Sequence, residues 1–338
     1  MNRKTSRPAF LFHTLVVLTL ALTVTAVSGA SAEASTLANL SSPSSVTTDI
    51  YNDQTIVVQS APVGATVYDR ANIHVSNPPP FPGGTVTFDL FHNTTCSGAP
   101  ISSEIKPVTN FAAISSPTVV PATGLSYLAH YSGDGTFDPS DSVCEPLNPI
   151  ITLKSDAGCD GWVLESGENT SVGGTMNNIA TTLRLGDNGS RKQYRSILCF
   201  YTGPALPDTA VVTAVTLNVK KFGVNGPGDP VSLFQGFMAE IKKGSFGLPA
   251  LELTDWQAVA NKTLGAFTPT LSGGWYSFDL TPGKTSINKL ATNSGLTQIR
   301  LRFKLGDNND AVANFLNLYS GNAGAASRPQ LIIEYSMP

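Results

Sequence analysis

From about residue 46 onward, the chain consists of short runs in which apolar and polar residues alternate. GTVTFDLF (84–91), VVTAVTLNVKK (211–221) and WYSFDL (275–280) each place every second side chain on an apolar face. Gly, Pro, Asn and Asp separate the runs, and long amphipathic helical patterns are missing, so the sequence predicts a nearly all-β protein. Further strands are expected at TIVVQS (55–60), GATVYDRANIHVS (64–76), LSYLAHYSG (125–133), GWVLES (161–166), TTLRLG (181–186), YRSILCFY (194–201), QIRLRFKLG (298–306), ANFLNLYSG (313–321) and PQLIIEY (329–335).

The first 32 residues have the pattern of a signal peptide. Arg3, Lys4 and Arg7 precede an apolar stretch, and Ala30-Ser31-Ala32 offers small residues at a cleavage site. The alternative is an uncleaved anchor, because the apolar stretch is nearly long enough to span a bilayer. Cleavage predicts a secreted or cell-surface protein with no membrane insertion afterwards.

Composition divides the rest of the chain into three parts. Residues 33–45 are small and polar, which predicts a flexible leader. Residues 46–148 and 153–338 form two strand-rich domains, and the short, stiff PLNP (146–149) is the expected boundary. A single helix is considered, near 283–293.

Charge limits the class of partner. The chain carries a net charge of −3, and removal of the three signal-peptide cations moves it to −6. Nucleic acids and anionic lipids select basic patches, so neither is expected as a partner.

The four cysteines, Cys96, Cys144, Cys159 and Cys199, favour disulfides in an exported chain. Four cysteines allow three pairings. A domain break near residue 150 gives each domain two of them, which predicts Cys96–Cys144 and Cys159–Cys199.

The first domain resembles bacterial Ig-like repeat domains. The resemblance rests on GGTVTFDLFHNTTCSGAPISSE (83–104) and LSYLAHYSGDGTFDPSDSVCEPL (125–147). It implies an Ig-like β-sandwich that acts as a spacer or an adhesive module.

The second domain resembles the DNRLRE-type domain, which is related to the family 96 carbohydrate-binding modules. The matching stretches are DGWVLESGENTSVGG (160–174), the segment 183–221, and 297–335 with its arginine strand and acidic turn. Gly306 departs from the family, which often has Asp there. The resemblance implies a jelly-roll β-sandwich, and some members of the family bind acidic polysaccharides.

Two GDN turns, at 186–188 and 306–308, are candidates for cation binding. Carboxylate and amide oxygens are the ligands that Ca²⁺ prefers. However, Asp and Asn also close tight turns between strands, and neither turn matches the EF-hand loop, so a structural role is favoured. No cofactor is predicted apart from a structural calcium, for which the candidate ligands are Asp160, Asp187, Asp307 and Asp310.

The residues that acid–base chemistry requires are scarce. The four histidines are His13, His74, His92 and His130, so residues 153–338 contain none and cannot form Ser–His or His–metal machinery on their own. Paired carboxylates are the remaining alternative, but the acidic residues are scattered among turns. The sequence therefore predicts that the chain is not an enzyme.

Aromatic and basic residues are the candidates for ligand binding. Alternation places Trp275 away from the apolar face of its strand, and Trp256 lies in a loop-like stretch, so both are candidates for stacking on sugar rings. Arg300, Arg302 and Lys304 share one strand face and are candidates for pairing with carboxylates. The alternatives are core packing for the tryptophans and cross-strand ion pairs for the basic residues.

Together these features predict a secreted, non-catalytic protein that binds carbohydrate, with an acidic polysaccharide of the cell surface or matrix as the expected ligand. The alternative is a structural or adhesive surface protein that contacts other proteins.

Overall fold

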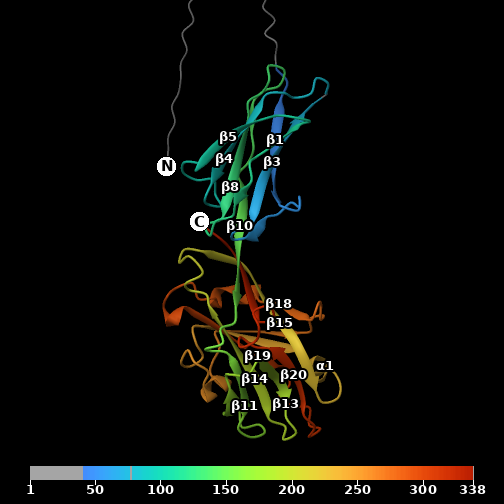
Figure 1. Ribbon diagram of the computed structural model, residues 1–338, viewed down its shortest axis with the longest axis vertical. Helices are drawn as coiled ribbons and strands as arrows, with labels where there is room; N and C mark the ends of the chain where they lie inside the picture. The colour runs from blue at the N-terminus through green and yellow to red at the C-terminus, as the bar shows by residue number, and fades with distance from the viewer. Residues whose placement is uncertain (1–40, 77, 338) are drawn as a thin grey trace, which may run out of the picture. The chain divides into compact units, whose positions relative to one another are not determined.

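The computed structural model describes residues 41–76 and 78–337 (Figure 1). The predicted signal peptide (1–32) and residues 33–40 of the predicted leader lie outside the described residues. Almost all regular structure is antiparallel β-strand, which confirms the all-β prediction. We call residues 41–147 the first lobe and residues 153–337 the second lobe, because each contains its own large cluster of buried apolar side chains.

The first lobe is a sandwich of two sheets, because alternate side chains of its strands are buried between them. One sheet has the order β1-β3-β6, with β7 also paired to β3, and the other has the order β5-β4-β8, with β10 and β9 paired to β8. Its strands are β1 (Ser44–Asn52), β2 (Ser60–Pro62), β3 (Thr66–Val75), β4 (Thr85–Phe91), β5 (Ser102–Pro107), β6 (Ala112–Ile114), β7 (Thr118–Val119), β8 (Leu125–Tyr131), β9 (Ser140–Asp141) and β10 (Glu145–Lys154).

The boundary between leader and first domain differs from the prediction. Strand β1 begins at Ser44, and Ser42 already donates a backbone hydrogen bond to Thr136. Ordered structure therefore extends into residues 41–45, where the sequence predicted a flexible leader, because the chain is held there by backbone hydrogen bonds that composition does not reveal.

The expected boundary PLNP lies inside strand β10. The first part of β10 pairs with β8, and its last part pairs with β21 (Gln330–Ser336) in the second lobe. The two prolines of PLNP, Pro146 and Pro149, are both accommodated within this strand.

The second lobe is also a β-sandwich (Figure 1). One sheet has the order β12-β11-β14-β19-β16-β17, and the other has the order β18-β15-β21-β10. Strands β13 and β20 connect them, since β13 pairs with β14 and β20 pairs with the end of β15. The strands are β11 (Gly161–Glu165), β12 (Gly173–Asn177), β13 (Thr182–Asp187), β14 (Gln193–Tyr201), β15 (Val211–Asn225), β16 (Phe237–Lys243), β17 (Lys262–Phe267), β18 (Trp275–Asp279), β19 (Leu296–Phe303), β20 (Asn314–Tyr319) and β21.

Helical structure in the described residues is short. It comprises α1 (Pro230–Leu233) and the 3₁₀ turns η1 (Leu253–Trp256), η2 (Thr281–Ser286) and η3 (Asn293–Gly295). The helix considered near 283–293 is wrong, because only its first turn forms, as part of η2, and residues 287–292 are not helical. No helix among the described residues is long and apolar enough to cross a membrane.

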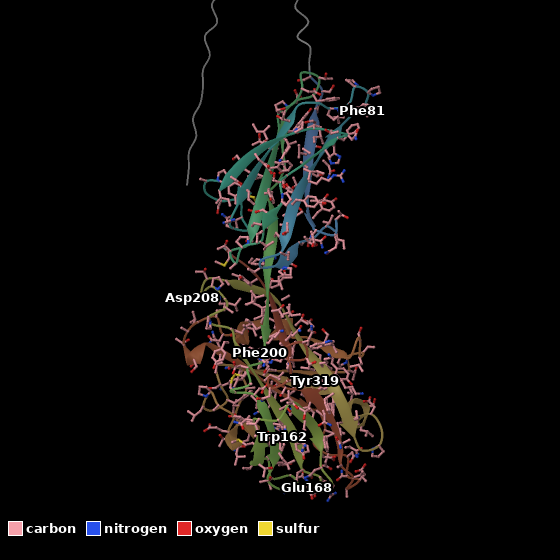
Figure 2. The ribbon with its side chains drawn as sticks, in the orientation of Figure 1. Phe81, Trp162, Glu168, Phe200, Asp208 and Tyr319 are labelled. Carbon is pink, nitrogen blue, oxygen red and sulfur yellow. A yellow bond between two sulfur atoms is a disulfide. The ribbon has the colours of Figure 1, made fainter. Side chains whose placement is uncertain are left out.

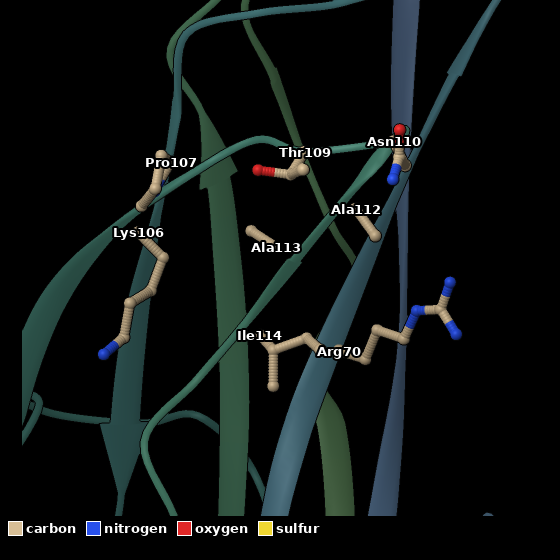
Figure 3. Close-up of a pocket in the computed structure, with 8 residues that line it drawn as sticks. All are labelled: Arg70, Lys106, Pro107, Thr109, Asn110, Ala112, Ala113 and Ile114. Carbon is tan, nitrogen blue, oxygen red and sulfur yellow. The ribbon is translucent and has the colours of Figure 1, made fainter.

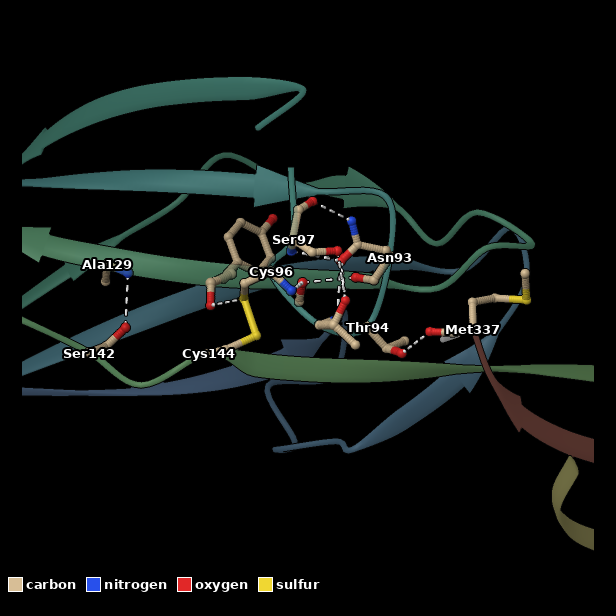
Figure 4. Close-up of a disulfide and its surroundings, with 11 residues drawn as sticks. Asn93, Thr94, Cys96, Ser97, Ala129, Ser142, Cys144 and Met337 are labelled. Carbon is tan, nitrogen blue, oxygen red and sulfur yellow. Dashed lines mark hydrogen bonds between the residues drawn. A yellow bond between two sulfur atoms is a disulfide. The ribbon is translucent and has the colours of Figure 1, made fainter. Parts of the chain in front are cut away.

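Both predicted disulfides are present. Cys96 pairs with Cys144 in the first lobe (Figure 4), and Cys159 pairs with Cys199 in the second. Cys159, Cys199 and Leu296 pack together as a separate buried cluster, so the second bridge ties the start of that lobe to the middle strands of its sheet.

Candidate functional site

The two GDN turns lie side by side. Asp187 of the first turn accepts the backbone N–H of Asn308 in the second turn at 3.3 Å, and that of Asn314 at 3.2 Å. Gly186 has φ of +121°, and a Cβ there would lie 2.2 Å from the carbonyl oxygen of Asn314, so only glycine fits. The first turn thus holds the second in place through hydrogen bonds.

The other carboxylates of these turns are also engaged by the chain. Asp307 accepts from the backbone of Asn309, and Asp310 accepts from Val312 and from the side chains of Asn308 and Asn314. The bonds from the backbone of Asn309 and Val312 are the local hydrogen bonds of Asx turns. Among residues 41–76 and 78–337, no group of three or more His, Cys, Asp or Glu side chains is placed to hold a metal ion.

Asp160, the remaining calcium candidate, is fully buried at the start of the second lobe. Its Oδ2 accepts from the hydroxyl of Ser155 at 2.9 Å and from the backbone of Gly321. Burial raises the pKa of Asp160 to about 6, because the hydrogen bonds only partly offset the loss of hydration. Asp160 therefore joins two chain segments that are distant in sequence.

Four of the predicted site residues meet in one polar pocket, which we call the arginine pocket. Its volume is about 190 Å³, and it lies against the outer face of β14 and the end of β19. The predicted residues in its lining are Trp256, Arg302, Lys304 and Asp307. The sequence did not identify the others, which are Glu165, Asn169, Ser171, Gln193, Arg195 and Gly306.

Trp256 is not the exposed stacking surface that its loop-like sequence allowed. Its side chain is 3% exposed, and it packs in a small apolar cluster with Val163, Ile197 and Leu251. The guanidinium of Arg195 lies 3.5 Å from the centroid of its ring. Trp256 is buried because the loop that carries it folds back over the outer face of the sheet.

Arg300 and Arg302 do share one strand face, but both already pair with Glu240 of the neighbouring strand β16. Arg300 is 4% exposed and also donates to the backbone carbonyls of Asp255 and Ala258. The prediction that Arg300 contacts a ligand is therefore wrong, because the cross-strand alternative holds there. Arg302 is partly exposed, so it can line the pocket while it pairs with Glu240.

The charge balance beneath the pocket affects the pKa values of its residues. Burial alone would raise the pKa of Glu240, but Arg300 and Arg302 outweigh it and hold the pKa below its ordinary value. Burial, together with the charges of the same two arginines, lowers the pKa of Arg195 to about 9.

Alternation within YRSILCFY could have identified Arg195, since it faces away from the buried Ser196 and Leu198.

Trp275 lies apart from this pocket, on the outer face of the other sheet. It is half-buried and pairs in register with Lys220 of β15. The Lys220 ammonium lies 5.7 Å from the ring centroids of both Trp275 and Tyr319. Phe222, which is 58% exposed, meets the Tyr319 ring edge-on at 5.3 Å. We call Trp275, Lys220, Tyr319 and Phe222 the aromatic strip.

A second aromatic group surrounds Arg184 on β13. The guanidinium lies 4.8 Å from the ring of Trp162, 5.5 Å from that of Tyr194 and 5.2 Å from that of Phe315. Phe315 and Tyr319 alternate with buried leucines on β20, so both point outward from the same strand. Trp162 and Tyr319 are labelled in Figure 2.

The first lobe has a larger but more open hollow, of about 550 Å³, between the edges of its two sheets (Figure 3). Arg70, Lys106 and Ile114 line it together with small residues. The sequence predicted no site here. The arginine pocket is smaller, but its polar side chains converge, so it has more capacity for specific recognition.

No family model matches the chain, and a comparison with curated proteins found no match. Among solved structures, one titled "BspA_C_mut" matches with 6% identity and a TM-score of 0.23, covering 87% of this chain and 90% of that one. The serine-rich repeat protein Srr2 from Streptococcus agalactiae matches with 8% identity and a TM-score of 0.17, covering 87% and 84%. Such low TM-scores carry no functional argument, so function is inferred from this chain's own residues.

Proposed function

We propose that this chain is a secreted or cell-surface, non-catalytic carbohydrate-binding protein whose second lobe binds an acidic polysaccharide. In this proposal the first lobe is an Ig-like spacer and the second lobe is a DNRLRE-type, carbohydrate-binding-module-like domain. The observation that carries the proposal is the aromatic strip, in which the rings of Trp275 and Tyr319 lie near the Lys220 ammonium and Phe222 packs edge-on against Tyr319.

The chemistry of the aromatic strip suits a sugar chain. Aromatic faces stack on the C–H edges of pyranose rings, while polar groups nearby bind the hydroxyls. A polar group lies close to the strip as well, since the exposed Asn225 accepts at 2.8 Å from the amide of Asn317, two residues before Tyr319 on β20. Lys220 and Arg184 supply positive charge for the carboxylates of an acidic chain.

We expect Trp275→Ala to weaken binding of the purified chain to a polyuronate by about tenfold, because a stacked ring contributes on the order of 1.4 kcal/mol. Tyr319→Ala should have a similar effect. The measurement is a binding panel of polyuronate, sulfated and neutral polysaccharides, run with calcium and again with EDTA.

Phe81→Ala is the matched control, because Phe81 is an aromatic residue that is 69% exposed in the first lobe. Equal binding by wild type and Trp275→Ala would contradict the proposal. Loss of binding in EDTA would show that calcium takes part, and would make Asp187, Asp307 and Asp310 candidate ligands again.

Adhesion to another protein is the second candidate, and the edge strand β5 favours it. Within the described residues β5 pairs with β4 on one side only, and Ile105 is 68% exposed at this edge. Exposed edges with apolar side chains are templates for pairing with another chain. If this function holds, Ile105→Lys should abolish adhesion of protein-coated beads to cells, and Trp275→Ala should not.

A further inference from the structure

We propose that the arginine pocket binds one small oxyanion, the carboxylate or sulfate group of an acidic sugar, through Arg195, Arg302 and Lys304. These three cations come from β14, from β19 and from the residue just after β19, and their side chains line the same cavity. Such a group accepts several N–H donors at once, and arginine binds it in bidentate fashion.

Arg195 has donors to spare. Its Nε donates to the side chain of Gln193 at 2.8 Å, and its Nη1 donates to the backbone carbonyl of Trp256 at 2.8 Å. A guanidinium has five N–H groups, so these two bonds fix its position without using all of its donors. The Trp256 ring against it leaves the guanidinium edge as the direction from which an anion can approach.

The carboxylates around the pocket are already engaged. Glu240 pairs with Arg300 and Arg302, and both oxygens of Glu165 accept backbone N–H groups, from Ser171 and Gln193. Among the residues that the structure describes, no carboxylate lies within ion-pair distance of Arg195. Burial, and next the charges of Arg300 and Arg302, lower the pKa of Arg195.

The occupant has to be small and charged. The cavity holds about 190 Å³ and its lining is mostly polar, so a single charged group fits better than an apolar one. Asp307 also lines the pocket, with Oδ1 accepting from the backbone of Asn309, so we expect the anion on the side of Arg195 and Lys304. A neutral sugar would leave Arg195 and Lys304 without an ion-pair partner among the described residues.

The arginine pocket is distinct from the aromatic strip, because none of the four strip residues lines it, and it is also separate from the aromatic group around Arg184. On β14, Arg195 and Ile197 face the loop that carries Trp256, whereas Tyr194 faces the aromatic group around Arg184. The inference rests on the proposed function only in assigning the anion to a sugar. It deepens that function by naming the charged group and Arg195, which the sequence did not identify.

The test is calorimetric titration of the purified chain with sodium glucuronate and with sodium sulfate. Glucose and sodium chloride at matched ionic strength are the references. We expect one saturable site for an oxyanion and none for glucose or chloride. Arg195→Lys and Lys304→Gln should each weaken binding by about tenfold. Lys262→Gln, an exposed lysine away from the pocket, should leave binding unchanged.

Lys304 is exposed, so Lys304→Gln stays interpretable even if Arg195→Lys disturbs the Trp256 loop. Absence of a saturable oxyanion site, or binding that neither variant weakens, would overturn the inference. Binding of sulfate without glucuronate would support the pocket and assign it to a sulfate group. Glucuronate binding without polysaccharide binding would support the pocket and reject the proposed function. Polysaccharide binding that depends on Trp275, without glucuronate binding, would support the proposed function and reject the pocket.

Discussion

Asp69→Asn is expected to stabilise the first lobe at neutral pH and to remove most of the pH dependence of its stability. Asp69 lies on β3 and is fully buried, and neither of its carboxylate oxygens has a hydrogen-bond partner among the described residues. Burial, with the nearby charge of Glu145, raises the pKa of Asp69 to about 8. A bare charge in the core would be so costly that the folded lobe keeps this carboxyl protonated, and holding the proton at neutral pH costs folding free energy.

The sign follows from proton linkage. The folded lobe keeps Asp69 protonated up to about pH 8, whereas the unfolded chain ionises it near the ordinary pKa of 3.8. Stability is therefore full below about pH 4 and is lost as pH rises towards 8, at roughly 1.4 kcal/mol per pH unit for one proton. Glu145 has a pKa raised mainly by burial, so it acts in the same direction. Asparagine keeps the shape without the charge.

The measurement is hydrogen exchange of peptides that contain β3, recorded between pH 5 and pH 8 after correction for the intrinsic exchange rate. All three tryptophans lie in the second lobe, so their fluorescence would report on the wrong lobe. Asp53→Asn, at an exposed position, is the control. Parallel pH profiles for the wild type and Asp69→Asn would contradict the assignment.

Alternation predicted strands well where one face is buried and the other is not. In β3 and β4 every second side chain is buried, as the pattern required. TIVVQS (55–60) failed, because a short apolar run is not evidence of burial: Ile56 is 59% exposed, and the segment forms only an isolated bridge at Val57 before β2 begins at Ser60. Strands β16 and β17 were missed, since their polar content hides them.

The candidate site was predictable only in part. Spacing correctly placed Arg300 and Arg302 on one face and turned Trp275 outward, because those properties depend on one strand. Which strands become neighbours depends on the whole fold. The sequence therefore could not show that Glu240 on β16 pairs with both arginines, or that Phe222 and Tyr319 meet beside Lys220. Burial of Trp256 depends on a loop folding back, which no local pattern encodes.

Glu240→Gln is expected to destabilise the second lobe by about 3–5 kcal/mol, the usual cost of breaking a buried ion pair from one side. Glu240 is 7% exposed and is shared by two arginines, of which Arg300 is 4% exposed. Its removal leaves a buried guanidinium without a counter-charge. Glu168→Gln is the matched control, since Glu168 pairs with Arg191 at the surface, where the expected cost is about 1 kcal/mol or less. Denaturant unfolding followed by tryptophan fluorescence measures both.

Two further results separate the ion pair from mere packing. Adding Arg300→Met to Glu240→Gln removes the orphaned charge, so the double variant should lose much less stability than the two single losses added together.

The pKa of Glu240 is lowered in the folded state, so its contribution to stability is present above the ordinary pKa near 4.5 and is lost as pH falls below it. The cost of Glu240→Gln should therefore shrink in acid. An additive double variant, or a cost independent of pH, would contradict this role. Protonation thus acts in opposite directions at these two groups: it stabilises the first lobe through Asp69 and weakens the second through Glu240, whereas Asp160, whose pKa is raised to about 6, opposes Glu240 within the second lobe.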